Sequence, residues 1–131
     1  MIGVRPLGVF GPRSRSEFAL DREELLAQGT LAESLRGQVA AYLRSGALVL
    51  ALMEHTRDVI DGAFGTPGGS GILTDGTFYW RADAADYVEH YGIAVDEEAL
   101  DWMESNDWQA PAVTPDELSR IDAELFKRLR L

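Results

Sequence analysis

The chain has 131 residues, a formal net charge of −10 and no cysteine. Its length is typical of one globular domain, and the absence of cysteine excludes disulfide bonds and thiolate chemistry within the chain. The longest apolar run covers residues 47–53, far short of the roughly 18 residues that a membrane-spanning helix needs. We therefore expect one cytoplasmic domain over residues 1–131, with no signal peptide and no membrane association.

The negative charge is concentrated in the last third of the chain. Residues 82–125 include thirteen acidic side chains and a single basic one, Arg120. Such a segment repels nucleic acid and attracts basic partners, although a merely solubilising role is the alternative. Eleven of the twelve basic residues are arginine, which is typical of a GC-rich genome and suggests an actinobacterial origin.

The first third of the sequence predicts an irregular segment followed by a helix. Residues 1–20 alternate apolar residues with glycine, proline and arginine, and Pro6 interrupts the one short strand that they could form. Asp21, with a glutamate three residues later, predicts the start of a short helix that Gly29 ends.

A longer helix and a strand are expected next. Thr30 and Glu33 match a capping box, and the apolar residues after them recur at helical spacing as far as Gly46. The apolar run 47–53 predicts a buried strand. The following residues read as a loop with one helical turn at 56–60.

The stretch SGILTDGTFYWR (70–81) predicts a β-hairpin. Its Asp75-Gly76 pair is favoured in two-residue type I′ loops, which would place Leu73 opposite Phe78. The glycines around it lack the lysine of a phosphate-binding loop, the third glycine of a dinucleotide fingerprint and the spacing of a nucleophile elbow. No cofactor is therefore expected.

The remainder of the chain predicts helices. Asp83 and Asp96 stand where two of them would begin, and Gly92 would end the first. Thr114 and Glu117 form a second capping box for a long C-terminal helix. The fold class is therefore α+β, with a small antiparallel sheet of two to four strands, including the 70–81 hairpin, packed with four to five helices; residues 82–131 form an acidic helical portion.

One segment resembles a known group of sequences. TDGTFYWRADAADYVEHYGI (74–93) is similar to small uncharacterised actinobacterial proteins that share a TDGxxxW hairpin followed by a YVExY helix. The resemblance implies a single domain of actinobacterial origin and brings no activity with it. The matching residues are Thr74, Asp75, Gly76, Trp80, Tyr87, Val88, Glu89 and Tyr91.

The charge distribution favours a non-enzymatic interaction domain that binds a basic protein partner through an acidic helical surface. Tryptophan among carboxylates is a plausible contact for such a partner. Small acidic immunity proteins that neutralise basic nuclease toxins are similar in size and charge. The expected contacts are Asp96, Glu97, Asp101, Trp102, Glu104 and Asp107.

Two alternatives remain open. A small-molecule binder or enzyme would have its site between the glycine-rich 54–70 loop and the 70–81 hairpin, because long glycine-rich connections often carry function. Neither a metal nor a specific catalytic residue is expected, since nothing in the sequence brings the two histidines together. A homodimer paired through the hairpin edge is the other alternative. The ligand site would use His55, Asp58, Asp61 and Tyr79.

Overall fold

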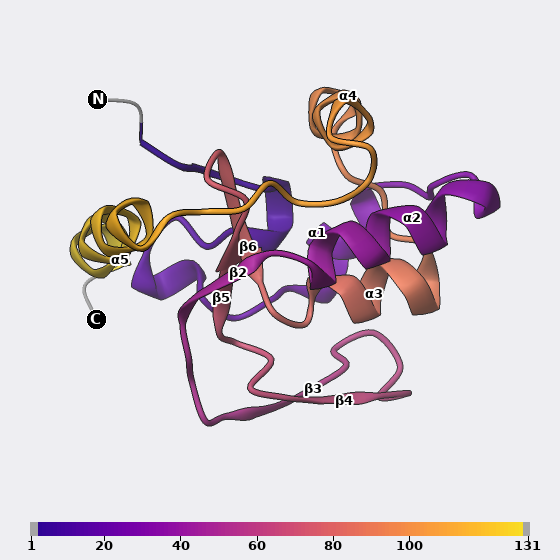
Figure 1. The fold of residues 1–131 in the computed structure, drawn as a ribbon. Coiled ribbons are helices and arrows are strands. Elements are labelled where there is room, and N and C mark those ends of the chain that lie inside the picture. The colour runs from indigo at the N-terminus through magenta and orange to yellow at the C-terminus, as the bar shows by residue number, and fades with distance from the viewer. Residues whose placement is uncertain (1–2, 130–131) are drawn as a thin grey trace.

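The computed structural model describes residues 3–129 and has the predicted α+β architecture (Figure 1). A four-stranded sheet has the order β1-β6-β5-β2, and a separate antiparallel pair, β3–β4, lies beside it. The main sheet is mixed rather than purely antiparallel, because β1 runs parallel to β6. The strands are β1 (Arg5–Pro6), β2 (Ala47–Leu50), β3 (His55–Arg57), β4 (Gly65–Pro67), β5 (Ile72–Thr74) and β6 (Phe78–Arg81).

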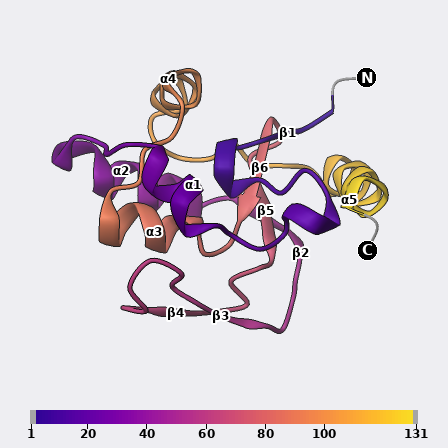
Figure 2. The same ribbon diagram turned by 180° about the vertical axis from the view of Figure 1, so that it is seen from behind.

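Helices cover both faces of the main sheet. α2 and α3 pack side by side on one face, α5 lies across the other, and α4 stands at the periphery (Figures 1 and 2). α1 is seen best from behind, in Figure 2. The helices are α1 (Arg22–Ala27), α2 (Glu33–Arg44), α3 (Ala84–Tyr91), α4 (Glu97–Ser105) and α5 (Pro115–Leu129).

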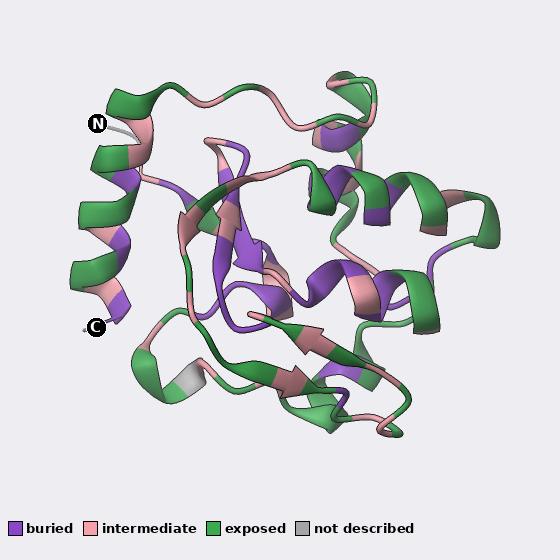
Figure 3. Cartoon of the chain, turned by 60° about the horizontal axis from the view of Figure 1, so that its bottom comes forward, coloured by how far each residue is buried: buried purple, intermediate pink, exposed green. Residues whose placement is uncertain are grey.

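The hairpin of β5 and β6 separates two hydrophobic clusters. Trp80 faces α2, where its indole N–H donates to the carbonyl of Leu43 at 3.0 Å. Ile72 and Tyr79 face α5, whose buried stripe is made by residues spaced four apart, Ile121, Leu125 and Leu129. Figure 3 shows this stripe as the inner side of a helix that is exposed on its outer side.

Several helix ends follow their sequence signals. The Asp21 carboxylate accepts the backbone N–H of Glu24 at 3.0 Å. Thr114 and Glu117 cap each other's backbone N–H groups, as a capping box requires. Gly92 ends α3 with a positive φ of 68°, a conformation that glycine adopts without steric cost.

The predicted capping box at Thr30 and Glu33 is wrong. Helix α2 begins at Glu33 itself, and no side chain caps it. The Thr30 backbone instead bridges to Ile93, and the N–H of the next residue, Leu31, donates to the carbonyl of Gly92. This long-range pairing holds the chain extended where the local pattern favours the first turn of a helix.

The apolar run 47–53 forms a shorter and more exposed strand than predicted. β2 ends at Leu50 after an irregularity in its pairing with β5, and its residues are half-buried or exposed. It is an edge strand, so only part of its surface is covered. Met53, beyond the strand, has 98% of its surface exposed.

The stretch expected to be a loop with a helical turn at 56–60 contains β3. Thr56 pairs with Thr66 of β4, and the N–H of Asp58 continues the ladder to the carbonyl of Phe64. β4 escaped prediction because it contains Gly65 and Pro67, two residue types that are depleted in strands.

The hairpin of β5 and β6 forms with a different register. Leu73 lies opposite Trp80 and Thr74 opposite Tyr79, so the loop is two residues longer than a type I′ turn. Because a shift of two residues preserves the alternation of a strand, the predicted division of side chains between the two faces is retained. The cause of the longer loop is the side chain of Asp75, which accepts the backbone N–H groups of Thr77 and Phe78.

Candidate functional site

Asp75 is the centre of a buried network that joins the hairpin to two helices. One oxygen accepts the two backbone N–H groups of its own turn, and the other accepts the Tyr42 hydroxyl and, at 3.0 Å, the Trp102 indole N–H. Burial raises the pKa of Tyr42, and the hydrogen bond to Asp75 and its negative charge raise it further. The residue that the sequence marked as a turn former is therefore a structural junction between the hairpin, α2 and α4.

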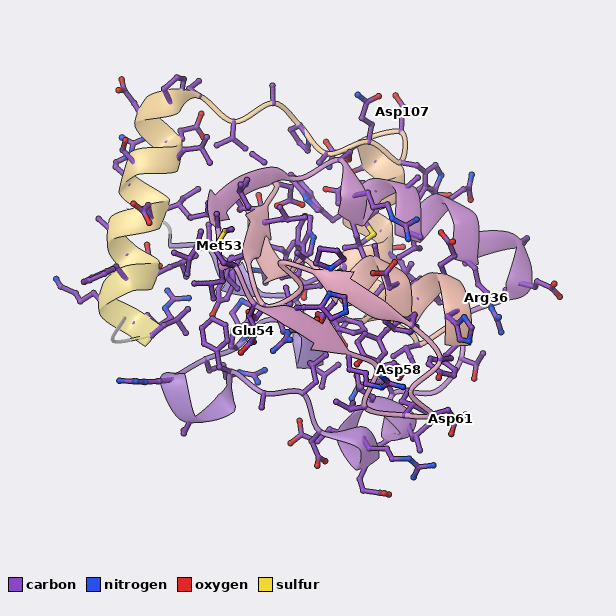
Figure 4. All side chains as sticks on the ribbon, turned by 90° about the horizontal axis from the view of Figure 1, so that it is seen from below. Arg36, Met53, Glu54, Asp58, Asp61 and Asp107 are labelled. Carbon is purple, nitrogen blue, oxygen red and sulfur yellow. The ribbon has the colours of Figure 1, made fainter. Side chains whose placement is uncertain are left out.

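The five predicted acidic contacts lie on and around α4. All five are exposed, and Asp107 projects at the edge of the molecule in Figure 4. Between residues 3 and 129, none of the five is paired with an arginine or lysine. We call these five the acidic surface: Asp96, Glu97, Asp101, Glu104 and Asp107.

Trp102 differs from the acidic contacts with which it was predicted. It is half-buried, and its only polar side-chain atom is already bonded to Asp75. Trp108 is also half-buried and packs against the main core. Asp107 and Trp108 both have positive φ, near 55° and 60°, and the N–H of Trp108 closes the end of α4 on the carbonyl of Met103. The tryptophans thus fix α4 to the body of the protein.

The four residues of the predicted ligand site are not gathered in one place. Tyr79 is fully buried on the α5 side of the sheet, where its hydroxyl donates to the carbonyl of Pro12 at 2.6 Å. His55 is exposed on β3 and borders a cavity that does not include Tyr79. Asp58 is buried, and Asp61 is exposed in the turn that follows it; Figure 4 shows both near the tip of the β3–β4 pair.

Asp58 organises the turn between β3 and β4. Its carboxylate accepts the backbone N–H groups of Ile60 at 2.8 Å and Ala63 at 2.9 Å, and also the hydroxyl of Tyr91. Burial alone raises the pKa of Asp58, but these hydrogen bonds outweigh it and hold the pKa below its usual value. Burial and the bond to Asp58 raise the pKa of Tyr91 to about 12. The carboxylate is therefore occupied by structural bonds.

We expect Asp58→Asn to lower the free energy of unfolding at neutral pH by about 1–3 kcal/mol, because an amide cannot accept all three of these bonds. A carboxylate with a depressed pKa stabilises the fold above its unfolded pKa, near 4, and that contribution is lost as the pH falls through the folded pKa. Urea unfolding between about pH 3 and pH 7 should therefore show that the free energy of unfolding decreases less with falling pH in the variant than in the wild type. Parallel curves for the two proteins would contradict this role.

A buried ion pair lies close to His55. Arg81 and Asp83, 5% and 1% exposed, form two bonds with each other, at 3.0 and 2.8 Å. The third guanidinium nitrogen donates to the carbonyl of Phe18, and Thr56 donates to Asp83 at 2.9 Å. This pair explains why Asp83 stands at the start of α3 without capping it. The polar side-chain atoms of the pair are all engaged in these hydrogen bonds, which join three segments of the chain. The pair is therefore not available to bind a charged ligand.

Among the cavities beside β3, two are partly walled by residues 15–20, and the sequence predicted only part of their walls. The smaller, of about 250 Å³, is bordered by His55, Arg57 and the buried pair of Arg81 and Asp83. The larger, of about 520 Å³, lies next to it and shares Glu54 with it. The expected 54–70 loop does border a site, but the opposite wall comes from residues 15–20. No local pattern could have brought that distant segment to the loop.

Comparison of the chain with protein families, with curated proteins and with solved structures finds no match. Among the residues that the structure describes, no three histidine, aspartate or glutamate side chains are grouped so that they could hold a metal ion. Over the same residues, no helix has both the length and the apolar character needed to cross a membrane. Function is therefore inferred from the charges and geometry of this chain.

Proposed function

We propose that the protein is a non-enzymatic interaction domain that binds a basic protein partner through the acidic surface. The observation that carries this proposal is the gathering, on and around a single helix, α4, of five exposed carboxylates that form no ion pair with a described residue. Neighbouring acids are neutralised by arginine: Asp86 and Glu89 share Arg44, and Glu98, the acid of α4 outside this group, pairs with Arg5. The acidic surface has no such partner among the described residues, so its field is directed to solvent.

An uncompensated charge of this kind acts mainly on association. It accelerates the encounter with a basic partner and disfavours acidic ones, and salt weakens both effects. The helix that carries it is held rigidly, because the Trp102 indole N–H is bonded to the buried carboxylate of Asp75. By analogy with immunity proteins, a basic toxin-like protein is the class of partner to test first.

Neutralising four of the five carboxylates of the acidic surface is expected to abolish partner capture at low salt. The variant carries Asp96→Asn, Glu97→Gln, Asp101→Asn and Glu104→Gln, which keep side-chain shape and remove four negative charges. A pull-down from an actinobacterial lysate at low and moderate salt identifies the partner. The affinity of the purified pair is then measured, and we expect a loss of at least about tenfold, because several charge-assisted contacts disappear together.

A matched control removes the same charge elsewhere. Four exposed acids outside α4 are changed to their amides, and this control should bind within about twofold of wild type, because distant exposed charges are screened. An equal loss of affinity in both variants would mean that binding depends only on net charge and would contradict a specific role of the acidic surface. Unchanged binding by the α4 variant would also refute the proposal. The control substitutions are Glu23→Gln, Glu33→Gln, Asp61→Asn and Asp122→Asn.

A further inference from the structure

The larger cavity beside β3 has the composition of a small-molecule site. Its volume of about 520 Å³ falls within the range of natural ligand sites, roughly 300–1,000 Å³. Phe18, Leu52 and Met53 supply an apolar lining, and Arg15 and Glu54 supply charge. In Figure 4, Met53 and Glu54 lie beside each other between α5 and the β3–β4 pair. This cavity includes no residue of α4, so a ligand bound in it is independent of the proposed partner.

Ser70 places a polar group without a partner in the cavity wall. The residue is 3% exposed, and its hydroxyl forms no hydrogen bond with any described residue. Buried hydroxyls in native proteins are nearly always bonded, so this one calls for a partner from the cavity. One rotation about the Cα–Cβ bond changes where the oxygen points, and a ligand can select that rotamer.

Arg15 and Glu54 border the same cavity with opposite charges, yet they form no ion pair. Neither is bonded to another charged side chain among the described residues. The adjacent pair of Arg81 and Asp83 behaves differently, because each of its charged groups is saturated by the other and by neighbouring polar groups. Among the described residues that line this cavity, the charges available to a ligand are therefore one guanidinium and one carboxylate.

We propose that the cavity binds a small zwitterion with a hydrocarbon side chain, of the class of apolar α-amino acids. Its carboxylate would bind Arg15, whose guanidinium matches a carboxylate with two parallel bonds, and its ammonium would bind Glu54. The side chain would pack against Phe18 and Met53, while Ser70 donates to the carboxylate.

Other classes of small molecule would pair with fewer of the charged groups that line this cavity. A simple carboxylic acid would be repelled by Glu54, and a simple amine would be repelled by Arg15. A neutral apolar molecule would leave both charges unpaired. Because the two charged groups of an α-amino acid are adjacent, they can bridge an arginine and a glutamate that are too far apart to touch each other.

The test is calorimetric titration of the full chain with four probes: L-phenylalanine, L-leucine, 3-phenylpropionate and 2-phenylethylamine. We expect saturable one-to-one binding of L-phenylalanine, with each single-charge analogue at least about tenfold weaker, since each lacks one charge-assisted contact. Equal affinity for L-phenylalanine and its analogues would indicate unspecific apolar adsorption and overturn the proposal. The absence of saturable binding by all four probes at millimolar concentration would also overturn it.

Two variants test which residue of the cavity binds each charged group of the ligand. In Glu54→Gln, the preference for L-phenylalanine over 3-phenylpropionate should disappear; in Arg15→Gln, its preference over 2-phenylethylamine should disappear. Both residues are exposed, so the fold should tolerate the changes. Glu33→Gln, on α2, should bind as wild type does. Preferences that survive in both variants would refute the assignment. Binding that is unchanged when the acidic surface is neutralised would separate this site from the proposed partner site.

Discussion

Replacing Asp75 with alanine is expected to lower the free energy of unfolding by about 3–5 kcal/mol, among the largest effects of any single substitution in this chain. The residue is 3% exposed, and its carboxylate accepts four hydrogen bonds, two from its own turn and one each from Tyr42 and Trp102. Its removal leaves four donors without this acceptor, two of them buried and two half-buried, and a buried donor without a hydrogen bond costs free energy because it has also lost its contact with water. Urea unfolding followed by tryptophan fluorescence measures the effect, because Trp102 reports directly on the network.

The chain contains a matched control in its second Asp-Gly pair. Asp61 is exposed in the turn after Asp58, so Asp61→Ala should change stability by no more than about 0.5 kcal/mol. The loss of stability in Asp75→Asn should lie between those of the two alanine variants. The amide oxygen can still accept the bonds from the turn, but the amide NH2 group is a donor and faces the donors of Tyr42 and Trp102. Equal stability of Asp75→Ala and Asp61→Ala would show that the network contributes nothing.

Asp75 also shows what the sequence could predict and what it could not. The Asp-Gly pair and the alternating apolar residues were sufficient to locate the hairpin and to assign its faces. The register depended on a buried carboxylate turned inward toward α2 and α4, whose residues lie about 30 positions away on either side. Local patterns contain no information about such partners.

The same limit accounts for the other errors. Thr30 matches a helix cap, but its backbone is paired with the segment after α3. Gly65 and Pro67 have low strand propensity, yet they complete a strand because β3 supplies the pairing. Asp21 and Thr114, in contrast, cap their helices as predicted, because the groups they bind lie within three residues of them.

The two candidate sites also differ in how far the sequence could predict them. Exposure of the acids of α4 follows from helical periodicity, which turns them away from Ala99 and Met103 on the buried side. The ligand cavity could not be assembled from sequence, because Arg15, Glu54 and Ser70 come from three separate segments. Only the folded chain brings their side chains to one wall.

Breaking the buried pair of Arg81 and Asp83 is expected to be the second large effect. Arg81→Met or Asp83→Asn should each cost about 3–5 kcal/mol, because either change leaves a buried charge without its counterpart. The double variant should be clearly more stable than the sum of the two losses predicts, since neither charge then remains. A coupling energy above about 1 kcal/mol in the double-mutant cycle would establish direct interaction.

An exposed pair supplies the control for this cycle. Arg5 and Glu98 are 2.9 Å apart with more than half of each side chain exposed, so their coupling should lie within about 0–1 kcal/mol. The difference between the two cycles measures what burial adds. The buried pair also receives a bond from Thr56 and reaches the carbonyl of Phe18, so its loss should loosen β3 and the N-terminal segment together. Additive losses in the Arg81 and Asp83 cycle would mean that other contacts hold these segments in place.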